Sequence, residues 1–152
     1  SGSPQSGGVI QVVNATYSTF FSTSSGSLVA TGLAATITPK FSTSKILILV
    51  SITDAYQTTS SYSVAYTVYR NSTNIAPTGS GLNQNLGYTY ITSANPQINM
   101  NISNLDSPAT TSSTTYNFQL AAYTNNGGST MYLNYNYNNV SISTITLLEI
   151  AA

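Results

Sequence analysis

The sequence has almost no charge and lacks three residue types on which much protein chemistry depends. Only six of its 152 residues are charged, three basic and three acidic, and it has no His, Cys or Trp. Without His or Cys, Ser-His-Asp and Cys-His catalysis, the usual zinc sites and disulfides are excluded. Three basic residues cannot neutralise a phosphate backbone, so electrostatic nucleic-acid binding is excluded as well. No apolar run approaches the roughly 20 residues that span a bilayer, and we expect no membrane insertion.

The acidic residues are too few and too scattered for the chemistry that carboxylates usually perform. They are Asp54, Asp106 and Glu149. A glycan-cleaving enzyme needs two carboxylates roughly 5 to 10 Å apart, and these three could meet only by converging across subunits. A calcium site needs clustered carboxylates, which the sequence does not contain. We therefore expect a protein that is not an enzyme and that has no catalytic residues, no metal and no cofactor.

The residues that are abundant point to an ordered protein made of β-strands. Hydrophobic residues are 41% of the chain, with twelve Tyr and four Phe, while Ser, Thr, Asn and Gln together number 69. Disordered chains lack the aromatic and β-branched residues that offset the entropy lost on folding. The strongest helix formers with charged side chains are nearly absent, whereas Val, Ile, Thr and Tyr favour strands.

Short apolar runs separated by Gly, Asn, Ser and Pro predict an all-β fold, an antiparallel jelly-roll sandwich of roughly ten strands. Residues 9–152 form this single domain. Residues 1–8 have the composition of a flexible linker, either a cloning remnant or the end of an upstream stalk. The predicted strands are 9–17, 19–23, 28–31, 34–38, 45–52, 62–70, 86–91, 97–102, 114–123, 131–137 and 141–150.

Two of these strands are apolar on both faces, which an antiparallel sandwich does not require. In 45–52, four β-branched residues lie on one face of the strand, and Leu47 and Leu49 lie on the other. In 141–150, Ile145 and Leu147 lie on the same face as Glu149. The second apolar face needs its own cover. We predict that these five residues form a subunit interface. The alternative is that a loop or the linker folds over them.

Several blocks of the sequence resemble a domain found at the C-termini of marine bacteriophage tail-fibre and related virion proteins. In order, the blocks are GVIQVV at 8–13, SKILILV at 44–50, YRNSTNI at 69–75, LDSPATTSSTTY at 105–116 and STITLLEIAA at 143–152. The resemblance covers almost all of the chain after the linker. It implies a virion protein that is extracellular once released.

The strand order also looks like the trimeric jelly rolls of complement-type globular heads and tumour necrosis factor. This fold-level resemblance implies a homotrimer in which the first and last strands pair at the centre of one sheet, next to the threefold axis. Glu149 would then lie near the interface. It would either pair with Lys45 or Arg70, because an uncompensated carboxylate is costly there, or reach water at the end of the sheet.

Tyrosine and asparagine are concentrated at 132–139, just after the Asn-Asn-Gly-Gly turn at 125–128. Both residue types suit adaptable recognition, because Tyr offers a flat ring with a polar tip and Asn an amide that donates and accepts. Two smaller collections lie at 56–62 and 83–88. For any single Tyr, stabilisation of a neighbouring strand is the simpler interpretation. The candidates for receptor binding are Asn125, Asn126, Tyr132, Asn134, Tyr135 and Tyr137.

These observations lead to one functional hypothesis and one alternative. The first is the trimeric C-terminal tip of a phage tail fibre that attaches to a glycan or protein of the host cell surface, with weak contacts repeated on three subunits. The alternative is a trimerisation, capping or capsid-decoration module with no receptor of its own.

Overall fold

Two antiparallel sheets make up the part of the chain that the computed structural model describes, namely residues 4–58, 62–80, 83–93, 96–123, 129–135 and 141–152. The all-β jelly-roll prediction is confirmed, with eleven strands in place of roughly ten. They are β1 (Val9–Tyr17), β2 (Phe21–Thr23), β3 (Val29–Ile37), β4 (Lys45–Gln57), β5 (Tyr62–Arg70), β6 (Thr73–Asn74), β7 (Gly87–Ile91), β8 (Gln97–Asp106), β9 (Thr114–Tyr123), β10 (Met131–Leu133) and β11 (Ser143–Ile150).

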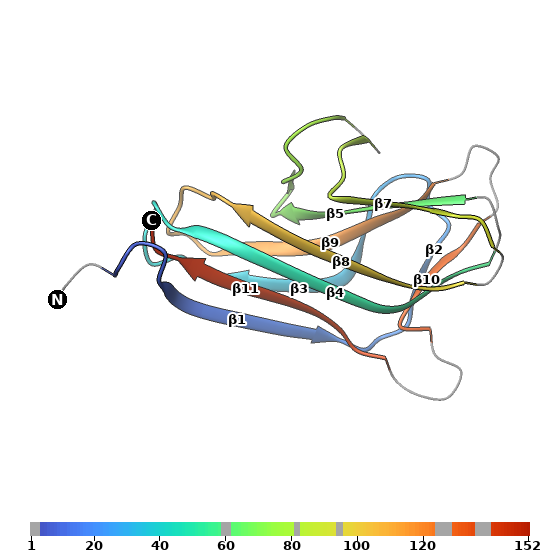
Figure 1. Ribbon diagram of the computed structural model, residues 1–152, viewed down its shortest axis with the longest axis horizontal. Coiled ribbons are helices and arrows are strands. Elements are labelled where there is room, and N and C mark those ends of the chain that lie inside the picture. Colours follow the sequence, from blue (N-terminus) through green and yellow to red (C-terminus); the bar gives the residue numbers. More distant parts are fainter. Residues whose placement is uncertain (1–3, 59–61, 81–82, 94–95, 124–128, 136–140) are drawn as a thin grey trace.

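The connectivity is that of a jelly roll, because the chain passes repeatedly from one sheet to the other. One layer has the order β1-β11-β4-β8, with β10 and β2 continuing it at the far end of β4. The other has the order β3-β9-β5, with β6 and β7 pairing to β5. Figure 1 shows the layers stacked, with both termini at one end of the molecule and β2 and β10 at the other.

Strand β4 is longer than the sequence predicts because it passes through an irregularity instead of ending. The predicted strand stops at Ile52, where Thr53 and Asp54 interrupt the apolar run. In the structure the register with β8 shifts between Ile52 and Ala55, and Asp54 adopts a φ of 48°. A bulge of this kind bends a strand without ending it. It carries β4 on to Tyr56, which pairs with β10.

The two predicted strands at 28–31 and 34–38 are one strand, β3, with an irregularity at Gly32. The register with β9 shifts between Ala30 and Ala34, and Gly32 has a φ of 100°. A Cβ at this position would lie 3.0 Å from the ring of Tyr17. Glycine is therefore required here by both the backbone and the packing.

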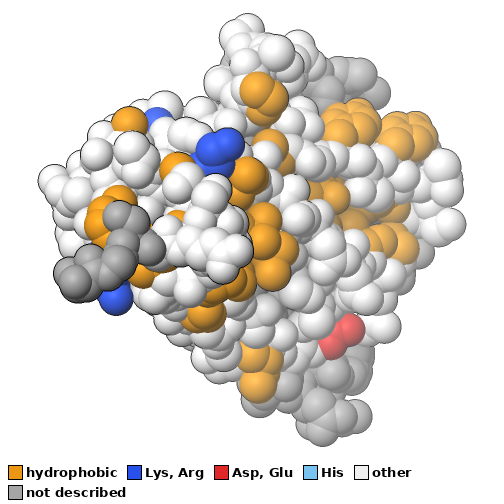
Figure 2. Space-filling view, turned by 60° about the vertical axis from the view of Figure 1, so that its left-hand side comes forward, with side chains coloured by type: hydrophobic (Ala, Val, Ile, Leu, Met, Phe, Trp, Pro, Cys, Tyr) orange, Lys and Arg blue, Asp and Glu red, His pale blue; other side chains and the backbone are white. Residues whose placement is uncertain are grey.

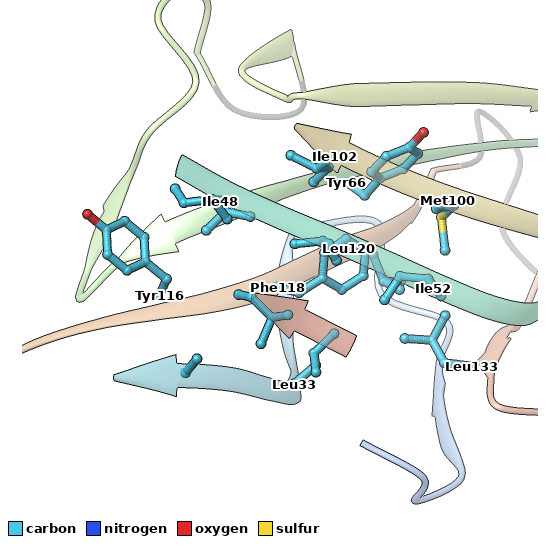
Figure 3. Packing of buried hydrophobic residues seen from close by; sticks show 14 of the residues in the cluster. Leu33, Ile48, Ile52, Tyr66, Met100, Ile102, Tyr116, Phe118, Leu120 and Leu133 are labelled. Atoms are coloured by element: carbon cyan, nitrogen blue, oxygen red, sulfur yellow. The ribbon is translucent and has the colours of Figure 1, made fainter. Parts of the chain in front are cut away.

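The core lies between the sheets and is built from alternate residues of the long strands. Ile46, Ile48, Val50 and Ile52 of β4 are buried there, as the alternation predicts. Tyr66, Phe118 and Leu120 approach from the other sheet, and Figure 3 shows their side chains meeting those of β4 and β8. The residues that alternate with the buried ones of β4, such as Leu47 and Leu49, point to the outer face of the sheet, where β4 is held between β11 and β8.

Two expectations about β1 and β11 need correction. The two strands do pair, from Val9↔Ile150 to Tyr17↔Ser143, but β1 lies at the edge of its sheet and not at the centre. Ile145, Leu147 and Glu149 do not face a partner subunit. All three are fully buried within the single chain, because they point between the sheets. The outward residues of β11 are those that alternate with them.

Candidate interaction surfaces

An exposed row of apolar side chains crosses the outer face of the sheet β1-β11-β4-β8. Val12 pairs with Leu148, Leu148 with Leu47, and Leu47 with Leu105, so one residue comes from each strand. Val12 is 58% exposed and Leu105 51%, while the two central leucines are partly exposed. We call these four residues the apolar row. Figure 2 shows hydrophobic side chains gathered on this side of the molecule among few charged ones.

A shallow hollow of about 470 Å³ lies beside the apolar row on the same face. Leu49, next to Leu47 along β4, forms part of its wall, and small polar side chains surround the rest. The hollow exists because serine and threonine follow the leucines along the strands. Its lining includes Leu49, Ser51, Asn101, Ser103, Thr144 and Thr146.

Two of the five residues predicted to form a subunit interface lie on this outer face. Leu47 and Leu49 face outward, as the prediction requires, and Leu49 is 39% exposed. Val12 and Leu105, at the two ends of the apolar row, remain more than half exposed. Val12, Leu105 and Leu148 are the residues of this face that the sequence analysis missed. Strand register could not be read from the sequence, so nothing indicated that they align with Leu47.

Glu149 is a buried carboxylate held by hydrogen bonds instead of by a cation. It accepts hydrogen bonds from the Gln11 amide at 2.6 Å and from the backbone N–H groups of Lys40 at 2.7 Å and Phe41 at 3.3 Å. Burial raises its pKa, but the neighbouring Ser44 hydroxyl and these donors outweigh burial and hold the pKa below its usual range. Neither predicted partner of Glu149, Lys45 or Arg70, is needed.

Arg70 pairs with Asp106 instead, and this pair connects the two sheets. Its guanidinium donates to both carboxylate oxygens of Asp106 at 2.8 Å, and the Tyr116 hydroxyl donates to the same carboxylate at 2.7 Å. Burial, and then the hydrogen bond and charge of Asp106, raise the pKa of Tyr116, which Arg70 opposes. Asp106 therefore stabilises the sandwich in addition to ending β8.

The acidic residues are thus engaged in holding the fold. The Asp54 carboxylate accepts a hydrogen bond from the Ser141 hydroxyl, and its backbone carbonyl accepts one from Tyr135. No group of three or more metal-ligating side chains occurs in the described part of the chain. The same residues contain no helix long and apolar enough to cross a membrane.

Four aromatic rings gather at the end of the outer face farthest from the chain termini. Tyr56 stacks on Tyr135 with ring centroids 4.7 Å apart and 16° between the planes. Tyr132 lies 5.9 Å from Tyr56 and 5.4 Å from Tyr135, and Phe20 lies 5.5 Å from Tyr132. We call these four residues the aromatic cluster. Phe20 is 53% exposed and the tyrosines are partly exposed.

The structure brings two of the predicted receptor-binding residues together and assigns another to the fold. Tyr132 and Tyr135 belong to the aromatic cluster. Asn134 is buried, and its amide donates to the carbonyls of Tyr17 and Thr19 at 3.0 Å while its oxygen accepts from Ser143. It therefore positions the chain and does not face a ligand. The other three candidates, Asn125, Asn126 and Tyr137, lie outside the described residues.

The sequence analysis did not identify Phe20 as part of this surface. It lies in a segment predicted to be a strand, where an aromatic residue is ordinary. Its contact with Tyr132 spans more than a hundred residues and depends on the pairing of β2 with β10. A signal was present, because Phe20 and Phe21 are adjacent and alternation can bury only one of them.

Comparison with known proteins identifies the fold and not a family. No protein-family model matches the chain, and no curated protein matches it. Among solved structures, it is similar to a chain of infectious bursal virus derived T=1 particles, with a TM-score of 0.50 and 12% identity. The match covers 93% of this chain and 36% of that one.

Two further structures of infectious bursal disease virus are similar at lower scores. They are the Gx strain, with a TM-score of 0.46 and 13% identity, and the VP2 subviral particle, with 0.47 and 13%. The matches cover 95% and 93% of this chain, and 37% of each viral chain. This chain thus spans little more than a third of the proteins it resembles. Identity this low supports the shared jelly-roll fold alone.

Proposed function

We propose that this chain is a non-enzymatic structural domain of a virus particle that assembles with copies of itself through the apolar row. The observation that carries the proposal is the row itself, four aligned apolar side chains of which two are more than half exposed, with Leu49 beside them on the same face. Aligned apolar side chains exposed in this way mark an interaction surface. The jelly-roll fold shared with the T=1 particle supports the virion setting.

The size of the face supports a stable contact. Four strands spaced about 4.8 Å apart, each contributing about seven residues, give a flat area of roughly 500 Å² before side-chain relief is counted. This is the same order as the about 800 Å² per partner of a standard interface. The charged residue of β4 on this face, Lys45, lies at the first position of the strand and is exposed. Association through the middle of the face would therefore not bury its charge.

The finer assignment that we propose is the trimeric C-terminal tip of a bacteriophage tail fibre. It rests on the sequence blocks named above, and it adds attachment to a glycan or protein of the host surface. A capping, trimer-nucleating or capsid-decorating module without a receptor is the second candidate. The apolar row favours either equally, whereas the aromatic cluster favours a domain that also binds a ligand.

Analytical ultracentrifugation of Leu105→Asn tests the assembly. We expect the wild-type chain of 16.0 kDa to sediment as an oligomer, a trimer in the finer assignment, at micromolar concentration. Leu105→Asn should shift it toward monomer. Tyr90→Asn is the matched control, because Tyr90 is 57% exposed, an exposure similar to the 51% of Leu105, but belongs to β7 in the other sheet. A wild-type chain that is folded and monomeric would refute the proposal.

A further inference from the structure

The aromatic cluster has an arrangement that core packing does not require. Met131 and Leu133 of β10 are buried, as are Ala55 and Gln57 of β4. Tyr132 and Tyr56, which lie between the members of these two pairs, therefore point to the outer face. Their rings lie against those of Phe20 and Tyr135 on that face. Of the four, Phe20 is the most exposed, at 53%.

Polar side chains lie on both sides of the cluster in the same row of the sheet. Ser22 of β2 pairs with Tyr132, Tyr132 with Tyr56, and Tyr56 with Gln97 of β8. Ser22 and Gln97 are exposed. The row therefore offers a hydroxyl, two tyrosine side chains and an amide across four neighbouring strands, with Phe20 beside them as an apolar surface.

The cluster has one acidic neighbour among the described residues, Asp54, whose backbone carbonyl accepts a hydrogen bond from the N–H of Tyr135. Lys45 lies at the opposite end of β4, eleven residues from Tyr56, or roughly 35 Å at strand spacing. The Ser141 hydroxyl that donates to the Asp54 carboxylate does not neutralise it, so Asp54 disfavours an anionic ligand here. A charged ligand would find no opposite charge among the described residues of this row. The matching ligand is neutral, with one apolar face and several hydroxyl groups.

We infer that the aromatic cluster is a binding site for neutral saccharides, whose C–H faces stack on Phe20 and Tyr132 while Gln97 and Ser22 bond the hydroxyls. Pyranose rings have this combination of an apolar face and polar edges. Aromatic rings contact the apolar face, and the Gln amide forms hydrogen bonds with the hydroxyl groups at the edge. The inference rests on the receptor attachment proposed above and deepens it by naming the ligand class and the residues. The cluster lies at the end of the molecule opposite both termini (Figure 1).

An array of neutral and anionic oligosaccharides, followed by isothermal titration calorimetry with the best neutral oligosaccharide, tests the inference. We expect wild-type protein to bind neutral members of the array. Phe20→Ala should weaken binding at least tenfold, because it removes an exposed ring without opening the core. Phe20→Trp should retain binding, because stacking needs a flat ring and not phenylalanine itself.

Tyr90→Ala is the matched control for this experiment. Tyr90 is 57% exposed, like Phe20, but belongs to β7 in the other sheet, so its loss should leave the affinity unchanged. Binding confined to anionic glycans or to a host protein would overturn the inference, as would equal affinity of the wild type and Phe20→Ala. Sedimentation tests the apolar row, and glycan binding tests the aromatic cluster. A protein that binds no saccharide can still form the proposed oligomer, and a monomer can still bind a saccharide.

Discussion

At the scale of single residues, Glu149 illustrates how a nearly uncharged protein keeps a buried carboxylate. The carboxylate accepts three hydrogen bonds, two of them from backbone N–H groups of the segment that follows β3. Such bonds stabilise the charged form, so a cation is not required. In doing so, Glu149 joins β11, β1 and the connection between the sheets. A polar residue on an apolar strand thus serves the fold.

This environment predicts that acid destabilises the protein through Glu149. Because the folded state holds the pKa below its usual value, the unfolded chain takes up the proton first as the pH falls. The stabilisation is present above about pH 4.3, the ordinary Glu pKa, and is lost as the pH falls through the lowered folded-state pKa. Urea unfolding between pH 7 and pH 2 measures this loss.

Glu149→Gln is the variant that isolates the carboxylate. It should lower the free energy of unfolding at pH 7 by about 1–3 kcal/mol, because an amide replaces one acceptor oxygen with donors that face other donors. Its stability should also vary less with pH than that of the wild type. Identical pH profiles for the two proteins would contradict this account.

At the scale of elements, the pairing of β7 with β5 depends on a glycine. Gly87 lies opposite Tyr66, and a Cβ at Gly87 would overlap the Tyr66 ring. The ring of Tyr66 packs in the core against Phe118, with centroids 6.1 Å apart, so it has little freedom to move away.

Gly87→Ala is therefore expected to lower the free energy of unfolding by about 1–3 kcal/mol, the usual range for overpacking. Gly26→Ala provides the comparison, because a Cβ there meets nothing within 4 Å. It should change stability by no more than about 0.5 kcal/mol. Chemical denaturation of both variants measures the difference, and equal losses would show that Tyr66 moves aside.

At the scale of the whole molecule, the scarcity of charge predicts that the proposed assembly is insensitive to salt. We expect the apolar row to associate by the hydrophobic effect, which added salt does not screen. Surface ion pairs, which salt weakens, are nearly absent because the chain has only three acidic residues.

We expect the oligomer to sediment with the same mass at low salt and in 0.5 M sodium chloride, roughly the ionic strength of seawater, where the Debye length is only about 4 Å. Sedimentation equilibrium at a fixed protein concentration measures the mass in both buffers. Dissociation on adding salt would mean that charged groups hold the copies together, contrary to the role given to Val12, Leu47, Leu105 and Leu148.

The sequence by itself determined the fold class, the approximate positions of most strands and the core face of β4, because alternation and β-propensity are local properties of the chain. It also identified Leu47 and Leu49 as outward residues in need of cover. Only the tertiary structure decided which residues join them, since register between strands distant in sequence depends on packing of the whole sandwich. The same dependence placed Ile145 and Leu147 in the core, gave Glu149 its backbone donors, and brought Phe20 to the tyrosines.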